Sequence, residues 1–232
     1  MINDTSKPLV FLGSNSNILK IYELCCSAGY TVAGIIDDDY HGQGNFREFL
    51  IIASEQELID NLNEIQTTYQ FLCVTNWIPG EDNSRNREKR IRLINLLDQL
   101  NVQVATIISP LARVSAYSKI GQGVFVDDFA IIEPDVTVQD YVSMHPYSIV
   151  GHGSVLGRNS VIQRYCLITS NVTVESNVYL GLCSKICRSN VTLSNNTFLH
   201  PNLMLMRSTT ENEEVSLAGK DLRKVYQQVE VE

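Results

Sequence analysis

Residues 124–162 read VFVDDFAIIEPDVTVQDYVSMHPYSIVGHGSVLGRNSVI, and they repeat a pattern of six residues. Every sixth position from Ile108 to Met204 carries a large apolar side chain, with Thr192 as the exception. An α-helix repeats every 3.6 residues and a strand every two, so neither element alone explains a period of six. Short strands that turn a corner every six residues, with their large side chains stacked inside, do explain it.

A second series supports this interpretation. The residues two places before each large apolar position, from Thr106 to Asn202, are small or medium in size. Each unit therefore supplies one large and one smaller inward side chain, and three units close a triangular coil of 18 residues. The pattern predicts an unbroken run of coils over residues 106–206, without insertion, in which Thr192, Phe198 and Met204 are the last inward positions. Such a stack buries its core only by coil-on-coil packing.

Residues 1–105 have a different pattern, in which apolar strands alternate with amphipathic helices. This alternation predicts a small parallel sheet of Rossmann type. The expected strands are 8–12, 31–36, 69–74 and 102–107, and the expected helices are 18–28, 55–62 and 85–100. The sequence thus divides into an N-terminal domain (1–105), a coil domain (106–206) and a C-terminal tail (207–232).

Two polar segments of the N-terminal domain are candidates for binding a nucleotide. Gly13, Ser14 and Asn15 follow the first strand and precede a helix, which is where such folds hold phosphate. Asp37 and Asp38 end the second strand, where an acidic side chain can accept a hydrogen bond from a ribose hydroxyl. The alternative interpretation is a tight turn and a polar strand end without a ligand.

Composition excludes several classes of function. The net charge of −8 disfavours non-specific binding to nucleic acid. No apolar run reaches the ~18 residues of a membrane-spanning helix, and no signal peptide is recognisable, so we expect a cytoplasmic protein. Cys183 and Cys187 lie four residues apart, but no second Cys or His pair completes a zinc site, so no metal is expected.

The six-residue repeat resembles that of the hexapeptide-repeat acyltransferases, whose coils form a left-handed parallel β-helix. A Rossmann-like domain followed by such coils is similar to the sialic-acid O-acetyltransferase and bacillosamine-pathway N-acetyltransferase group. The segment Ile36-Asp37-Asp38-Asp39 matches that group, whereas Gly13-Ser14-Asn15-Ser16-Asn17 departs from its Gly-x-Gly-Gly-His or Gly-x-Ser-Gly-His loop. The resemblance implies acetyl-CoA as cosubstrate, a nucleotide-linked amino sugar as acceptor, and a homotrimer with coenzyme A between neighbouring subunits.

Acyl transfer needs a base, donors for the oxyanion and a groove for the pantetheine arm. His152 lies in Ile149–Gly157 (IVGHGSVLG), which resembles the family stretch Val-Ile-x-His-Glu/Asp-Cys-x-Ile-Gly, and this implies that His152 is the general base. The family's carboxylate is replaced by Gly153, so an acid that orients the imidazole must come from elsewhere. One coil later, Ser170 takes the family position whose backbone N–H faces the thioester carbonyl.

The resemblance implies further site residues. His145 takes a place often held by asparagine near the acceptor sugar, and Gly181 and Leu182 take places along the pantetheine groove. His200 replaces a glycine-rich stretch of that groove. Basic residues of the later coils and the tail either contact coenzyme A phosphates or form a solvated face; these are Arg158, Arg164, Lys185, Arg188, Arg207, Lys220, Arg223 and Lys224.

The favoured function is N-acetylation of the sugar by direct attack of its amine, with O-acetylation of a hydroxyl as an alternative. A non-catalytic binding or scaffold paralogue is a second alternative. A γ-type carbonic anhydrase would need three histidines on zinc, and the spacing of His145, His152 and His200 does not reproduce that family's close pair.

Overall fold

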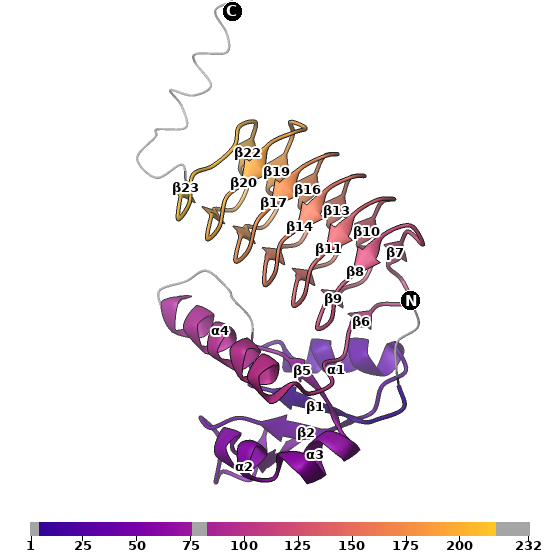
Figure 1. Ribbon diagram of the computed structural model, residues 1–232, viewed down its shortest axis with the longest axis vertical. Helices are drawn as coiled ribbons and strands as arrows, with labels where there is room; N and C mark the ends of the chain where they lie inside the picture. Colours follow the sequence, from indigo (N-terminus) through magenta and orange to yellow (C-terminus); the bar gives the residue numbers. More distant parts are fainter. Residues whose placement is uncertain (1–4, 76–82, 217–232) are drawn as a thin grey trace, which may run out of the picture.

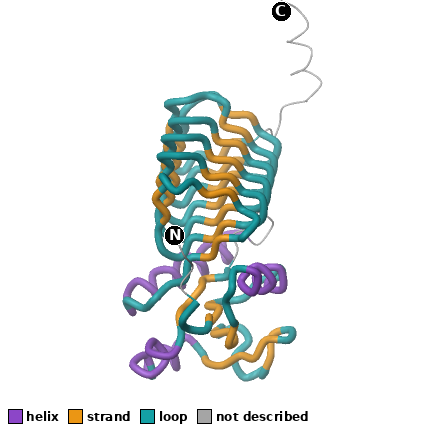
Figure 2. Tube along the Cα trace, turned by 90° about the vertical axis from the view of Figure 1, so that its right-hand side faces the viewer, coloured by secondary structure: helices purple, strands orange, loops and turns teal. Residues whose placement is uncertain are grey.

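The computed structural model describes residues 5–75 and 83–216. It consists of an α/β unit at the N-terminus and a stack of coils that rises from it (Figure 1). Strands of successive coils lie above one another in columns, so that the stack has flat faces (Figure 2).

The N-terminal unit is built on a five-stranded sheet with the order β3-β4-β2-β1-β5. Its strands are β1 (Leu9–Leu12), β2 (Val32–Ile36), β3 (Asn45–Phe46), β4 (Phe49–Ala53) and β5 (Gln70–Cys73), and all pairings are parallel except that of β3 with β4. The helices are α1 (Ile18–Ser27), α2 (Glu55–Asp60), α3 (Leu62–Thr68) and α4 (Asn83–Leu100). The predicted parallel pairing is confirmed for β1, β2 and β5, whereas β3 and β4 were not predicted. The strand expected at 102–107 is reduced to a single bridge between Phe71 and Val104, after which β6 begins.

The coils form three parallel sheets of seven, six and five strands. Along the six-stranded sheet, Ile132 pairs with Val150 and Val150 with Ile168, which confirms the predicted coil of 18 residues. The strands are β6 (Ile107–Ile108), β7 (Arg113–Val114), β8 (Lys119–Ile120), β9 (Phe125–Val126), β10 (Ile131–Ile132), β11 (Thr137–Val138), β12 (Ser143–Met144), β13 (Ile149–Val150), β14 (Val155–Leu156), β15 (Val161–Ile162), β16 (Leu167–Ile168), β17 (Thr173–Val174), β18 (Tyr179–Leu180), β19 (Lys185–Ile186), β20 (Thr192–Leu193), β21 (Phe198–Leu199), β22 (Met204–Leu205) and β23 (Glu214–Val215).

The corners of the coils use the left-handed backbone conformation. Residues with φ near +60° recur every six positions from Gly123 to Cys183. Asparagine and glycine tolerate this conformation best, and asparagine occupies many of the corners. Four aromatic residues also adopt it, and the rings of three of them, Phe129, Tyr147 and Tyr165, stack on one another with centroids 5.0 and 5.1 Å apart. The fourth is Tyr141.

The predicted unbroken repeat is wrong at one place. The left-handed corners at Cys183 and Asn190 are seven residues apart, and Val174 pairs with Leu193 in the next coil. This one-residue insertion moves Leu193, Leu199 and Leu205 inward, where they are buried in place of the predicted Thr192, Phe198 and Met204. Leu199 and Leu205 are each preceded by another apolar residue, Phe198 and Met204. The six-residue pattern therefore fits either register at these two sites.

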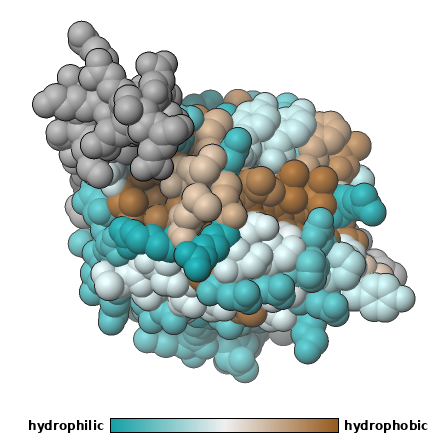
Figure 3. Space-filling view, turned by 90° about the horizontal axis from the view of Figure 1, so that it is seen from above, coloured by the Kyte–Doolittle hydropathy of each residue, from teal (hydrophilic) through white to brown (hydrophobic). Residues whose placement is uncertain are grey.

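The predicted end of the coils at residue 206 is also too early. β23 pairs with β21, so the described part of the predicted tail belongs to a last coil, which Arg207 and Glu213 close by an ion pair. Seen from this end of the stack, apolar surface gathers among polar residues (Figure 3), and Met204 and Met206 of the last coil are exposed. Residues 217–232, with Lys220, Arg223 and Lys224, lie outside the described part.

Candidate active site

His152 lies on the corner between the six-stranded and five-stranded sheets, which we call the second corner. Its side chain is 58% exposed. The imidazole Nδ1 lies 2.9 Å from the hydroxyl oxygen of Ser170, one coil above. Among the described residues, Nε2 has no hydrogen-bond partner. Because the bond at one ring nitrogen selects the tautomer, a proton on Nδ1 leaves Nε2 free to accept another.

Glu133, from the coil below, places a carboxylate near His152, where the sequence itself has Gly153. Its Oε2 accepts a hydrogen bond of 2.9 Å from the backbone N–H of His152 and lies 3.9 Å from Nδ1. Glu133 precedes His152 by 19 residues, so only the stacking of coils brings the two together. Glu133 is not among the residues predicted from the sequence, although it lies one coil length before Gly151.

Ser170 contributes two groups to the second corner. Its hydroxyl contacts His152, and within the described chain its backbone N–H has no hydrogen-bond acceptor. An open groove of about 550 Å³ adjoins the same corner on the outer face of the six-stranded sheet. It is lined by Arg113, Val114, Ser115, Ile131, Ile132, Glu133, Pro134, Asp135 and His152.

Gly181, Leu182 and His200 lie elsewhere, on the corner between the seven-stranded and six-stranded sheets, which we call the first corner. Leu182 is exposed, and Gly181 lies directly under His200, where a Cβ would meet the backbone of the next coil. His200 Nε2 is 2.5 Å from Glu214 Oε1. Within one chain, the structure does not bring these three residues together with His152 and Ser170, because the six-stranded sheet separates the two corners.

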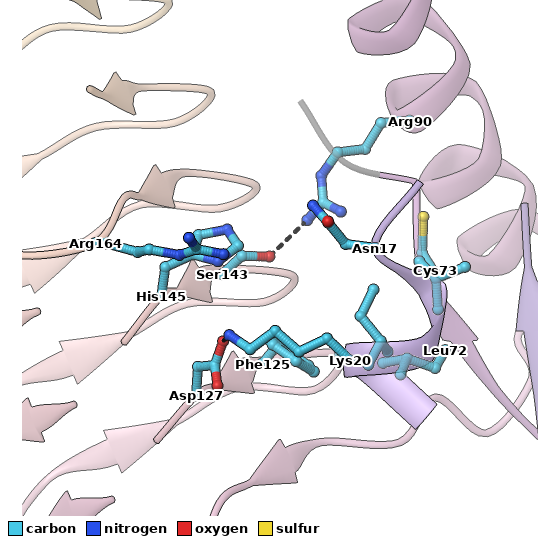
Figure 4. Close-up of a pocket in the computed structure, with 13 residues that line it drawn as sticks. Asn17, Lys20, Leu72, Cys73, Arg90, Phe125, Asp127, Ser143, His145 and Arg164 are labelled. Carbon is cyan, nitrogen blue, oxygen red and sulfur yellow. Dashed lines mark hydrogen bonds and ion pairs between the residues drawn. The ribbon is translucent and has the colours of Figure 1, made fainter. Parts of the chain in front are cut away.

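His145 also lies on the first corner, in a pocket between the N-terminal unit and the coils (Figure 4). Lys20 of α1 reaches across this pocket to form an ion pair with the buried Asp127. Burial, followed by the positive charges of Lys20, Arg164 and Arg90, lowers the pKa of the partly buried His145 to about 3. The imidazole of His145 is therefore neutral near pH 7, and it can donate or accept a hydrogen bond but is a weak base.

Arg90 of α4 is buried at the junction of the two units. Its guanidinium donates to Asn159 Oδ1 (2.7 Å), to the carbonyl oxygens of Thr75 (2.9 Å) and Tyr141 (2.7 Å), and to Ser143 Oγ (3.3 Å). It thus joins α4 to the coils, and this role could not be recognised in the sequence of a charged helix. Of the other basic candidates, Arg158 pairs with Asp98 and Arg207 with Glu213.

The two predicted nucleotide-binding segments lie side by side, because the N–H of Gly13 donates to the carbonyl of Ile36. Gly13 has φ +81° and packs against Thr75, so a side chain there would collide. Asn15 bonds to the carbonyl of Val74, and its Oδ1 accepts the N–H of Asn17. Ser14 is partly buried beside them.

The acidic end of β2 is held by two contacts. Lys89 of α4 bridges Asp37 Oδ1 (2.7 Å) and Asp39 Oδ2 (2.6 Å), and Asp38 accepts the N–H of Glu55 at the start of α2. The carboxylate of Asp38 is therefore already hydrogen-bonded within the N-terminal unit. Asp37 is fully buried, and its Oδ2 has no hydrogen-bond partner within the described residues. A buried acceptor without a partner is uncommon in folded proteins.

The low pKa of His145 predicts a loss of stability in acid. The unfolded chain binds a proton on this residue near pH 6.5, whereas the folded chain does so only near pH 3. Unfolding therefore takes up a proton between these values, and the free energy of unfolding falls as the pH decreases through this window, by at most ~1.4 kcal/mol per pH unit. Urea denaturation at pH 7 and pH 5 should show a smaller fall for His145→Asn than for the native chain. Equal falls would contradict the assignment.

The described residues were also searched for a metal site and for a membrane-spanning helix. No cluster of three or more His, Cys, Asp or Glu side chains in the described ranges could hold a metal ion. Among the helices in the described part, none is long and apolar enough to cross a membrane.

No family model and no curated protein matches this sequence. Solved structures do match its fold. PerB from Caulobacter crescentus, crystallised with CoA and GDP-perosamine, is 20% identical over 88% of this chain and 91% of its own, with a TM-score of 0.73. WeeI from Acinetobacter baumannii AYE is 15% identical over 88% of this chain and 94% of its own, also with a TM-score of 0.73. The acetyltransferase domain of PglB from Neisseria gonorrhoeae FA1090 is 19% identical over 89% and 94%, with a TM-score of 0.56. The three parallel sheets thus match a left-handed parallel β-helix, and the chain shares the fold of hexapeptide-repeat sugar N-acetyltransferases.

Proposed function

We propose that this protein is an acetyl-CoA-dependent N-acetyltransferase that acts on a nucleotide-linked amino sugar. The observation that carries the proposal is the arrangement of His152, Ser170 and Glu133 on an outward corner beside an open groove. A histidine whose ring contacts a hydroxyl, with a carboxylate nearby, has the composition of a general base. The fold likeness to PerB, which binds CoA and GDP-perosamine, supports the choice of substrates.

The mechanism is direct attack of the sugar amine on the thioester carbon of acetyl-CoA. His152 Nε2 takes the proton that the amine loses as the C–N bond forms. The backbone N–H of Ser170 stabilises the oxyanion. When the C–S bond breaks, the thiolate of coenzyme A receives the proton from His152, which leaves the acetylated sugar, free coenzyme A and the imidazole in its starting form.

The N-terminal unit acts as a Rossmann-type nucleotide-binding domain in this proposal. The phosphates bind near Gly13, Ser14 and Asn15, where the chain enters α1. Asp37 Oδ2 accepts a hydrogen bond from a ribose hydroxyl, which would satisfy a buried oxygen that has no partner among the described residues. Because the proposed substrates are nucleotide sugars and acetyl-CoA, we expect the protein to act in the cytoplasm.

The proposed active form is a homotrimer. The outer face of the six-stranded sheet carries Ile131, Ile149 and Leu167, and the stacked rings of Phe129, Tyr147 and Tyr165 run along the first corner beside it. Phe129, Tyr147 and Tyr165 are 46%, 46% and 54% exposed, and exposed apolar residues that lie together are typical of an interface. The five-stranded sheet instead presents mostly Lys and Thr outward.

Assembly through this face would also complete the site. The first corner of one copy, with Gly181, Leu182 and His200, would meet the second corner of its neighbour, with His152 and Ser170. Coenzyme A would then lie between two copies. This explains why residues with related expected roles lie on two different corners of a single chain.

The experiment is an acetyl-transfer assay with acetyl-CoA and a panel of UDP-, GDP- and dTDP-linked amino sugars. The reaction is monitored through release of the coenzyme A thiol. We expect thiol release that depends on an amino sugar of the panel, with a mass gain of one acetyl group on that sugar. Thiol release with a matched hydroxyl sugar would indicate O-acetylation instead. Absence of transfer to every member would favour a non-catalytic paralogue.

A further inference from the structure

The pocket between α1 and the coils has an unbalanced charge. Among its described lining residues are three cations, Lys20, Arg90 and Arg164, and a single carboxylate, that of Asp127. His145 adds no charge near neutral pH because burial and these cations lower its pKa to about 3. Arg164 is exposed and Lys20 is half-buried, so both are within reach of a ligand, and a cavity lined mainly by positive charge attracts an anionic one.

The three cations differ in what they already bind. Lys20 is paired with Asp127, and Arg90 donates to neutral oxygens that hold the domain junction together. Arg164 extends from the coils into the pocket beside His145 (Figure 4), and its guanidinium has no partner within the described residues. A free guanidinium binds a carboxylate or a phosphate through paired hydrogen bonds.

The size of the cavity distinguishes between these two anions. It measures about 30 Å³, and one water molecule needs about 10–15 Å³ in this measure. A carboxylate, which is about as large as two water molecules, fits this volume, whereas the diphosphate of a nucleotide is much larger. The phosphates also have a different expected place, at the loop that leads into α1.

We propose that this pocket binds a carboxylate on the sugar of the acceptor, so that the acceptor is a nucleotide-linked amino sugar acid rather than a neutral amino sugar. The inference rests on the proposed function, because it takes the acceptor to lie between the N-terminal unit and the coils. Arg164 is the specificity-determining contact, Lys20 adds positive charge, and neutral His145 donates or accepts a hydrogen bond. The sugar ring remains outside the small cavity, with its amine accessible from the neighbouring subunit.

The test is isothermal titration of the full chain with two matched pairs of probes that differ only in one carboxylate. These are UDP-glucuronate with UDP-glucose, and GDP-mannuronate with GDP-mannose, together with bare UDP and GDP. For the pair with the preferred nucleotide, we expect the acid to bind about tenfold more tightly than the neutral sugar. Arg164→Gln should reduce this preference to less than about threefold while leaving the neutral sugar unaffected.

Lys119→Gln is the matched control, because it removes one positive charge from the exposed face of β8, and it should retain the full preference. Equal affinities of the acid and the neutral sugar for the native chain would overturn the inference but leave the proposed function intact. If Arg164→Gln weakened the binding of UDP, of the neutral sugar and of the acidic sugar equally, Arg164 would contact a phosphate and the inference would be overturned. Absence of any nucleotide binding would overturn the proposed acceptor class itself.

Discussion

His152→Ala should lower kcat/KM for acetyl transfer by a factor of about 10²–10⁴, the range that general bases contribute. The reason is geometric, since the His152 side chain is 58% exposed and its Nδ1 contacts Ser170, which leaves Nε2 for the substrate. Steady-state assays of thiol release, with circular dichroism as a check of folding, measure the effect. The side chain packs against little, so the coils and the oligomeric state should be unchanged.

Two variants and a control sharpen this prediction. Glu133→Gln should keep the hydrogen bond to the backbone of His152 but remove the negative charge 3.9 Å from Nδ1, so a smaller loss of kcat is expected than for His152→Ala. Ser170→Ala should likewise give a partial loss. His41→Ala removes an exposed histidine from the N-terminal unit and should keep full activity. Unchanged activity of His152→Ala would contradict the assignment of the base.

Arg90→Met should reduce the free energy of unfolding by about 3–5 kcal/mol, because each buried acceptor that loses its donor costs about 1–3 kcal/mol. Methionine approximates the volume of the arginine stem, but it leaves the carbonyl oxygens of Thr75 and Tyr141 and the side chain of Asn159 without their donor. These groups join α4 to two coils, so the loss should appear at the junction of the units. Urea denaturation measures the change.

The control for Arg90 is Arg113→Met, which makes the same substitution at an exposed position on β7. Because surface substitutions usually change stability by less than about 0.5 kcal/mol, little effect is expected. Hydrogen exchange adds a second readout, since Arg90→Met should increase exchange at the junction more than within the inner coils. Equal effects of the two substitutions on stability would contradict the role given to Arg90.

The fold of the coils could be predicted up to Ile186, because an inward position that recurs every six residues must be apolar in every coil. The insertion after Cys183 could not be recognised, since Phe198-Leu199 and Met204-Leu205 offer an apolar residue in both registers. The choice depends on which residue can adopt φ near +60° at the corner, and Asn190, Asn196 and Asn202 occupy that conformation.

The site was less predictable than the fold. The role proposed for His152 is predicted from a local motif, but Glu133 reaches His152 only through stacking of neighbouring coils. Arg90 has the sequence setting of a surface helix residue, and its burial depends on how α4 packs against the coils. The surroundings of His145 depend on the placement of Lys20, which is distant in sequence. Contacts between separately folded units leave no periodic signal in the sequence.

Calorimetric titration of coenzyme A into the native chain tests the central claim most directly. If this protein is an acyltransferase of the proposed type, coenzyme A binds saturably with one site per chain, and acetyl-CoA competes for that site. Leu182→Glu, at the first corner of the coils, should weaken the binding because it introduces a charge into the proposed pantetheine groove. If the native chain shows no saturable binding of coenzyme A or acetyl-CoA, the proposed transferase function is wrong and the coils serve a non-catalytic role.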